Sequence, residues 1–285
     1  MIPSAFDYEI ATSPDHATSL LREGGEDARL IAGGHSLLPL MKLRLARPTL
    51  LVDIGRLDDL RYVREDGDRL VIGALTSHHE LESSGLLAEA CPLLSEAAGQ
   101  IGDPQVRHRG TVGGSIAHGD PASDLPAVLL ALNAELAVRG GQGERTIAIG
   151  DFFQMPFVTA LESDEMLAEI RIPRVGSSGG CAYLKFSRRA QDWAIVGVAA
   201  VVQTEGDRIE RAAIGLTNMG GTPLRAEAAE TALTGLDVGD GKGIRAAAGR
   251  AADETDPPQD IDASAEYRAA LARILVDRAV RAALG

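Results

Sequence analysis

The sequence has 285 residues, of which 45% are hydrophobic and 4% aromatic, and its formal net charge at pH 7 is -13. This much apolar material suffices for one large core or two to three smaller ones, so an ordinary soluble globular protein is expected. The negative charge repels phosphate backbones and anionic lipid headgroups, which argues against nucleic acid and membrane surfaces as general partners. An anionic ligand would need a local pocket of cations or backbone amides.

The two cysteines, Cys91 and Cys181, are far apart in the sequence and form no C-x-x-C pattern. Alone they cannot build a structural zinc site or an iron–sulfur cluster, and reduced thiols are expected. The N-terminal residues MIPSAFDYEI lack a basic segment followed by an apolar stretch, and no long apolar run occurs elsewhere. We therefore expect a cytoplasmic protein without stable membrane insertion.

The N-terminal part alternates between helical and strand patterns. Residues 14–23 predict a helix, because Ser13 can cap it and Pro14 fits its first position. Short apolar strands are expected at 28–32 and 50–54, which gives a β-α-β unit.

The next region predicts a hairpin and then mainly helices. Between residues 61 and 75, two strand-like runs flank Asp66-Gly67, a dipeptide that tolerates the positive φ values of a tight turn. The elements expected after it are helices at 76–83 and 92–100, a glycine-rich stretch at 109–120, a buried helix starting at Asp124, and strands near 134–139 and 165–172.

After Pro173 the pattern changes to long strands, and GSSGG at 176–180 is typical of a linker or exposed turn. The expected elements are strands at 181–187, 194–204 and 208–217, followed by helices at 225–234, 242–253 and 265–283. This order predicts an antiparallel three-stranded sheet backed by helices, as a C-terminal domain of its own.

Two glycine-rich turns are candidate anion sites: Ala32-Gly33-Gly34-His35-Ser36 and Thr111-Val112-Gly113-Gly114-Ser115. Glycines let backbone amides approach an anion, and a helix start adds partial positive charge. Neither turn is a G-x-G-x-x-G, and the nearest textual match, at 241–246, follows no predicted strand. Taken singly, each turn is more often structural than ligand-binding.

Taken together, the two turns and the sequences around them resemble those of a known family. AGGHSLLPLMKLRLARPTLLVDIG at 32–55 and TVGGSIAHGDPASDLPAVLLALNAEL at 111–136 are similar to the FAD-binding subunits of xanthine dehydrogenase-type and carbon monoxide dehydrogenase-type enzymes. The sequence is most similar to the medium subunits of the carbon monoxide dehydrogenase group. IGDPQVRHRGTVGGS, AYLKFSRR, AAIGLTNMGGTPLRA and AEYRAALARILVDRAV extend the likeness, in the same order, over nearly the whole chain.

The resemblance implies an α+β fold in two parts. The first is an FAD-binding domain of the vanillyl-alcohol oxidase-like type at 1–175, with lobes at about 1–55 and 56–175. The second is a smaller α+β domain at 176–285, with the three-stranded antiparallel sheet and the C-terminal helices.

The same resemblance implies which residues hold FAD. Backbone amides of Ala32, Gly33, Gly34, His35 and Ser36 would wrap the pyrophosphate, and those of Thr111, Gly113, Gly114 and Ser115 would do so from the second lobe. Asp124 stands where the family places a carboxylate near the adenosine part, a group able to accept from ribose hydroxyls or the adenine amine. From the sequence alone, an N-cap of the helix at 124–133 is an equal alternative for Asp124.

Two more residues are implied near the flavin ring. Lys185 matches a family lysine whose charge could stabilise a reduced anionic flavin, and its plain alternative is a solvated strand residue. Trp193 falls where relatives tend to carry Tyr beside the isoalloxazine, and an indole can stack there as well. Without the resemblance, packing in the core or at an edge is the better interpretation of a lone Trp.

The histidines and arginines near the turns have less definite roles. His35 is a candidate donor to a phosphate or the flavin edge, and His118 follows the second turn. Neither has acidic or histidine partners at metal-ligand spacing. His78 and His79 are expected merely to begin a helix. The remaining group, Arg107, His108 and Arg109, could steer an anionic cofactor, pair with carboxylates at a subunit interface, or form a solvated turn.

The leading functional hypothesis is an electron relay. The resemblance implies that FAD in this chain takes electrons from a small partner subunit with two [2Fe-2S] clusters and passes them to an external acceptor. A large partner subunit would hold the molybdenum cofactor and the substrate, in a dimer of heterotrimers. The alternatives are a self-sufficient FAD-dependent oxidoreductase acting on a small molecule, for which no persuasive general base is visible, and a scaffold protein that has lost FAD.

Overall fold

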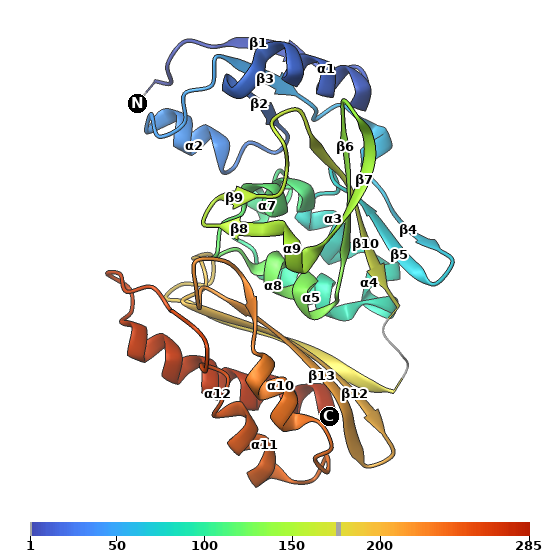
Figure 1. Ribbon diagram of the computed structural model, residues 1–285, viewed down its shortest axis with the longest axis vertical. Coiled ribbons are helices and arrows are strands. Elements are labelled where there is room, and N and C mark those ends of the chain that lie inside the picture. The colour runs from blue at the N-terminus through green and yellow to red at the C-terminus, as the bar shows by residue number, and fades with distance from the viewer. Residues whose placement is uncertain (1, 175–177) are drawn as a thin grey trace.

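The computed structural model describes residues 2–174 and 178–285, and its three larger sheets define three stacked units (Figure 1). The N-terminal unit holds a parallel sheet in the order β1-β3-β2. Its elements are β1 (Asp7–Ile10), α1 (Pro14–Gly24), β2 (Ala28–Ile31), α2 (Leu37–Lys42) and β3 (Leu50–Asp53). The predicted β-α-β unit is confirmed, and the Ser13 side chain caps α1 by accepting from the His16 amide.

The middle unit is built on an antiparallel sheet in the order β4-β5-β10-β6-β7. Its strands are β4 (Val63–Asp66), β5 (Arg69–Gly73), β6 (Glu135–Gly140), β7 (Gly143–Ala148) and β10 (Met166–Pro173), with a separate hairpin of β8 (Phe153–Met155) and β9 (Val158–Thr159). The Asp66-Gly67 hairpin is confirmed, with Gly67 at a φ of 62°.

Seven helices belong to the middle unit as described: α3 (His78–Ser83), α4 (Gly85–Ala90), α5 (Pro92–Gly99), α6 (Pro104–Arg107), α7 (Val112–His118), α8 (Asp124–Ala131) and α9 (Ile149–Phe152). The prediction of a glycine-rich turn around Gly113 was wrong in one respect, because these residues form the first turn of α7. The Thr111 hydroxyl caps that helix by accepting from the Gly114 amide at 3.1 Å.

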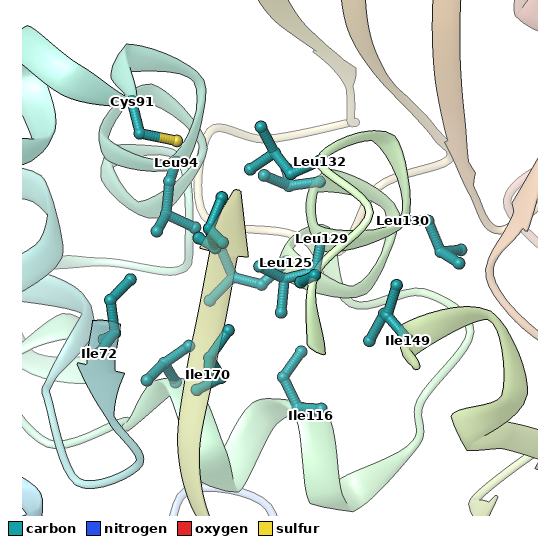
Figure 2. Packing of buried hydrophobic residues seen from close by; sticks show 14 of the residues in the cluster. Ile72, Cys91, Leu94, Ile116, Leu125, Leu129, Leu130, Leu132, Ile149 and Ile170 are labelled. Carbon is teal, nitrogen blue, oxygen red and sulfur yellow. The ribbon is translucent and has the colours of Figure 1, made fainter. Parts of the chain in front are cut away.

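The core of the middle unit lies between the sheet and α5, α7 and α8 (Figure 2). Helix α8, DLPAVLLA, is buried at every position, as its unbroken apolar sequence predicts. Leu125 and Leu129 of this helix and Ile170 of β10 belong to the same buried cluster in the close-up. Helix α8 is therefore a fixed support, and it carries Asp124 at its first position.

The C-terminal unit contains a four-stranded antiparallel sheet in the order β11-β12-β13-β14. Its elements are β11 (Gly179–Phe186), β12 (Val196–Glu205), β13 (Arg208–Thr217), β14 (Leu224–Arg225), α10 (Glu227–Leu233), α11 (Gly241–Ala248) and α12 (Ala265–Leu284). The three predicted long strands and the helices are confirmed. The prediction of only three strands missed β14, because two residues give no readable alternation.

The expected linker at 176–180 is only partly within the description, since residues 175–177 lie outside it. Gly179 and Gly180 belong to β11. A Cβ built on Gly180 would lie 2.3 Å from the Ala283 carbonyl oxygen, so this glycine permits close packing of α12 on the strand. Composition alone does not distinguish such a packing glycine from a linker glycine.

The C-terminal sheet is covered on both faces. Helices α10 and α12 pack on one face, while the other rests on α5 and α8 of the middle unit (Figure 1). A Cβ built on Gly215 of β13 would lie 1.9 Å from the Ala127 carbonyl oxygen of α8, which shows how closely the two backbones approach. The same face of the sheet brings Lys185 of β11 to Asp124 at the start of α8. Within the described residues, no helix is both long and apolar enough to cross a membrane.

Candidate functional site

Two cavities adjoin the line where the N-terminal and middle units meet, and they share lining residues at the two glycine motifs. The larger has a volume of about 1140 Å³ and the smaller about 630 Å³. Every residue predicted to bind a cofactor lines the larger cavity: Ala32, Gly33, Gly34, His35, Ser36, Thr111, Gly113, Gly114, Ser115, Asp124, Lys185 and Trp193. The fold thus gathers residues from all three units around one space.

The first glycine motif presents free backbone donors to this cavity. Among the described residues, the amides of Gly33, Gly34, His35 and Ser36 donate no hydrogen bond to the protein. Gly34 has a φ of 77°, a conformation that glycine adopts without strain and that turns successive amides toward one side. Such a concave run of amides is suited to an anion such as a pyrophosphate.

The second motif differs from the expectation that its amides wrap an anion. The Gly113 amide donates to the Ala74 carbonyl at 2.9 Å, and the Gly114 amide donates to the Thr111 hydroxyl at 3.1 Å. The Ser115 amide donates to the Thr111 carbonyl within α7. These donors are already satisfied, so this motif offers the cavity its hydroxyl groups and the open space above Gly114.

Gly33 and Gly113 are packing glycines. A Cβ on Gly33 would lie 2.0 Å from the Arg109 carbonyl oxygen, and one on Gly113 would lie 2.5 Å from the Ala74 Cβ. The structural interpretation of a Gly-Gly turn therefore applies to these two positions. Because the Arg109 backbone precedes the second motif, the contact at Gly33 also ties the two motifs together.

Asp124 and Lys185 form a buried ion pair on the cavity wall. The Lys185 Nζ donates to the Asp124 carboxylate at 2.9 Å and to the Gln100 carbonyl at 3.0 Å, and both side chains are 4% exposed. The Tyr183 hydroxyl also donates to Asp124. Burial raises the pKa of Asp124, while the positive charge of Lys185 opposes this effect.

Both plain alternatives for this pair were wrong. Ser123 occupies the N-cap position of α8, and the Asp124 carboxylate faces Lys185 and Tyr183. Lys185 is an inward-facing strand residue and is not solvated. Tyr183 was missed by sequence reasoning, although it lies two residues before Lys185 and therefore on the same face of β11.

Trp193 is 58% exposed and lines the cavity, so it is not packed in the core. It lies in the loop between β11 and β12, close in sequence to Lys185 at the end of β11. A large exposed aromatic ring at the rim of a cavity is available for stacking on a ring ligand.

The histidines fall into three settings. His35 lines the larger cavity, and His118 also lines it, with its ring 5.2 Å from that of Phe157 and its pKa lowered by burial. His78 does begin α3, as expected, but it is buried, and burial lowers its pKa to about 4. The rings of His79 and His108 stack at 3.9 Å beside the smaller cavity.

The two predicted arginines have different surroundings. Arg107 donates to Glu82 at 2.8 Å and to the Ile101 carbonyl, so it pairs within this chain. Arg109 lines the smaller cavity together with Arg56 and Arg61. In the part of the chain that the structure describes, the guanidinium groups of these three residues have no ion pair or hydrogen bond. Asp53, which binds the Gly55 amide at 2.8 Å and the Tyr8 hydroxyl, adds a carboxylate.

Comparison with protein families gives two matches that together span most of the chain. Residues 4–175 match the FAD binding domain in molybdopterin dehydrogenase, and residues 181–283 match the CO dehydrogenase flavoprotein C-terminal domain. The medium chain of carbon monoxide dehydrogenase from Hydrogenophaga pseudoflava is 43% identical, over 99% of this chain and 98% of that one. Subunit alpha of the 6-hydroxypseudooxynicotine dehydrogenase complex from Paenarthrobacter nicotinovorans is 42% identical, over 100% and 96%.

Solved structures agree. A structure of carbon monoxide dehydrogenase from Hydrogenophaga pseudoflava superposes with a TM-score of 0.96 at 45% identity, covering 99% of this chain and 98% of that one. Quinoline 2-oxidoreductase from Pseudomonas putida 86 gives a TM-score of 0.94 at 30% identity, covering 100% and 98%. The two-part FAD-binding fold is thereby confirmed. The chain belongs to the FAD-binding medium subunits of the carbon monoxide dehydrogenase and xanthine dehydrogenase family of molybdenum hydroxylases.

Proposed function

We propose that this chain binds one FAD in the larger cavity and relays electrons from [2Fe-2S] clusters of a partner subunit to an external acceptor. The observation that carries this proposal is that the predicted residues, drawn from distant segments, all line one cavity of about 1140 Å³. When bound, the flavin supplies the redox chemistry. The protein supplies binding, orientation and electrostatics.

The free amides at 33–36 would hold the pyrophosphate, and Thr111 and Ser115 would add hydroxyl groups from the other side. Lys185 and Trp193 would lie at the isoalloxazine. The smaller cavity is then suited to the adenosine, because it joins the larger one at Gly33 and Thr111. It also offers Asp53 and arginines that have no ion pair with any described residue. FAD would cross from one cavity to the other at the glycine motifs.

This orientation changes the role of Asp124. The resemblance placed Asp124 near the adenosine and Lys185 near the flavin, yet the two side chains are in contact at 2.9 Å. One ion pair cannot mark both ends of an extended FAD. We assign Asp124 to the flavin end, where it and Tyr183 fix the position of the Lys185 ammonium group.

We further propose the partners: a small subunit with two [2Fe-2S] clusters and a large subunit with the molybdenum cofactor, in a cytoplasmic dimer of heterotrimers. Support comes from relatives named as chains or subunits of larger enzymes. Relatives of nearly equal similarity are named for carbon monoxide and for 6-hydroxypseudooxynicotine, which supports a substrate site on another subunit. The proposed domains are 1–175, with lobes at 1–55 and 56–175, and 176–285; the two family matches support this division.

The self-sufficient oxidoreductase would need a free general base beside the flavin. Asp124 is buried at the proposed flavin end, but Lys185 and Tyr183 both bind its carboxylate. A carboxylate held in this way is a poor proton acceptor for a substrate. The relatives, which are parts of complexes, favour the relay.

The experiment is an absorption spectrum of the chain expressed alone and reconstituted with FAD, followed by co-purification from its native host. Flavin bands near equimolar with protein, together with iron- and molybdenum-containing subunits in the purified complex, are the expected result. Flavin without partner subunits would support the self-sufficient enzyme, and a chain that never retains flavin would contradict the proposal.

A further inference from the structure

The loop at 187–195 carries Trp193 and is held by other parts of the C-terminal unit. The backbone carbonyls of the two residues after Trp193, Ala194 and Ile195, each accept a hydrogen bond from a side chain outside the loop. The Asn218 side-chain amide donates to the Ala194 carbonyl at 2.8 Å. The guanidinium of Arg268 donates to the next carbonyl, that of Ile195. A loop held by side chains from two other elements has a defined position even though its ring is 58% exposed.

The backbone conformation of Asn218 and its second hydrogen bond fix its side chain for this contact. It follows β13 with a φ of 62°, a left-handed conformation that asparagine tolerates better than most residues but that still costs free energy. Its backbone amide donates at 2.9 Å to the carbonyl of Pro121, in the loop that leads to Asp124. Asn218 therefore connects the Trp193 loop to the segment that positions the Asp124–Lys185 pair.

Arg268 of α12 holds the same loop through the Ile195 carbonyl. It is 1% exposed on α12, and besides Ile195 it binds the Asp260 carboxylate at 2.6 Å. Its Nε has no hydrogen-bond partner among the described residues. Burying an arginine costs free energy unless its charge and its donors are satisfied inside the protein, and here Asp260 and the Ile195 carbonyl do so in part.

We infer that Asn218 and Arg268 are positioning residues that hold Trp193 at the mouth of the larger cavity. Held there, Trp193 limits access to the ring of a ligand that binds beside Lys185. The flavin part of this inference rests on the proposed function. The position of the loop does not, because it follows from contacts within this chain. Trp193 is the only tryptophan of the 285 residues, so its fluorescence reports this loop alone.

The decisive variant is Asn218→Asp, which keeps the size and the tolerance of a left-handed backbone but replaces the amide donor by an acceptor. Asn133→Asp is the matched control, because Asn133 is also left-handed, with a φ of 50°, and its side chain binds Arg225. Arg268→Lys is a second test that keeps the charge for Asp260 and removes the planar fork.

Acrylamide quenching of Trp193 is measured in the apo and FAD-loaded full chain, and iodide quenching of flavin fluorescence in the loaded chain. We expect Asn218→Asp to raise both quenching constants about twofold, as for a loop released from its local contacts, with flavin content unchanged. Arg268→Lys should raise them less, and Asn133→Asp should match the wild type.

Equal Trp193 quenching in wild type and Asn218→Asp would overturn the inference, as would an equal rise in Asn133→Asp, which would indicate general loosening. If Arg268→Lys does not fold, Asn218→Asp still decides. A wild-type chain without flavin would contradict the proposed function, while Trp193 quenching in the apo protein would still test the loop.

Discussion

Gly33 and Gly114 belong to similar motifs but have different surroundings. A Cβ on Gly33 would meet the Arg109 backbone at 2.0 Å, whereas one on Gly114 would meet only the Thr111 hydroxyl, at 2.8 Å. A backbone contact cannot be relieved by a side-chain rotation, but a hydroxyl can move by a few tenths of an ångström. Substitutions at Gly33 should therefore damage the fold, and substitutions at Gly114 should damage the site.

We predict that Gly114→Val lowers FAD affinity at least about tenfold, or roughly 1.4 kcal/mol, because its side chain would occupy the space of the pyrophosphate. The fold should survive, since valine has a higher helix propensity than glycine. The measurement is FAD titration together with urea unfolding of the apo protein. Gly85→Val is the control, because Gly85 is exposed at the start of α4 with no atom within 4 Å of a built Cβ. Normal FAD binding by Gly114→Val would contradict the assignment.

His78 makes stability depend on pH. Burial is the main cause that lowers its pKa from 6.5 to about 4, and His35 and Arg107 lower it further. The unfolded chain therefore binds a proton below pH 6.5 that the folded chain does not bind until about pH 4. The free energy of unfolding therefore decreases as the pH is lowered across this window.

We predict that His78 alone accounts for a loss of about 2 kcal/mol in the free energy of unfolding between pH 7 and pH 5. Urea unfolding of the wild type and of His78→Gln at both pH values measures the effect. The variant should lose less stability on acidification than the wild type, whatever its stability at pH 7. Parallel losses in the two proteins would show that folding does not lower the pKa of His78.

At the scale of elements, predictions succeeded where the pattern was long and failed where tertiary contacts decided. The strands around Val198 and Ile214 and the helix 265–283 were found because their apolar runs are long. Helix α7 was predicted as a turn, since Gly113, Gly114 and Ser115 have low helix propensity. Its helical form depends on the Thr111 cap and on Ala74, which no local pattern reveals.

Helix α8 and strand β11 are joined by the Asp124–Lys185 pair, whose side chains are both 4% exposed. Replacing Lys185 by Met leaves a buried carboxylate without its cation, and this should cost the apo protein about 3–5 kcal/mol. We predict that the double variant Lys185→Met/Asp124→Leu recovers much of this loss, because it removes the unpaired charge. Urea unfolding of the wild type, both single variants and the double variant gives the free energies of unfolding for a double-mutant cycle. A double variant no more stable than Lys185→Met would show that the ion pair does not account for the loss.

At the scale of the molecule, the site exists only after three units have packed together. The resemblance named residues on all three units, and the structure brings them to one cavity. It could not show that the Gly34 amide is free while the Gly113 amide is used, because this depends on which carbonyls lie nearby. The smaller cavity was missed for the same reason: Tyr8, Asp53 and Arg109 are far apart in the sequence and share no motif.

A ligand that spans both cavities should join the N-terminal and middle units, and the part that reaches the smaller cavity should add to its effect. We predict that FAD raises the melting temperature of the chain more than FMN at equal concentration. Saturation to about 100 times Kd corresponds to about 2.7 kcal/mol of stabilisation. Arg109→Glu, which places a negative charge in the smaller cavity, should lower the effect of FAD and leave that of FMN nearly unchanged.

Arg47→Glu is the matched control for this charge reversal, because Arg47 is exposed on the N-terminal unit and lines neither cavity. Its response to FAD and FMN should equal that of the wild type, since the change in net charge is the same as in Arg109→Glu. If Arg109→Glu weakens FAD and FMN equally, Arg109 acts on the phosphate or on the contact with Gly33. The adenosine would then have to lie in the larger cavity with the rest of the cofactor.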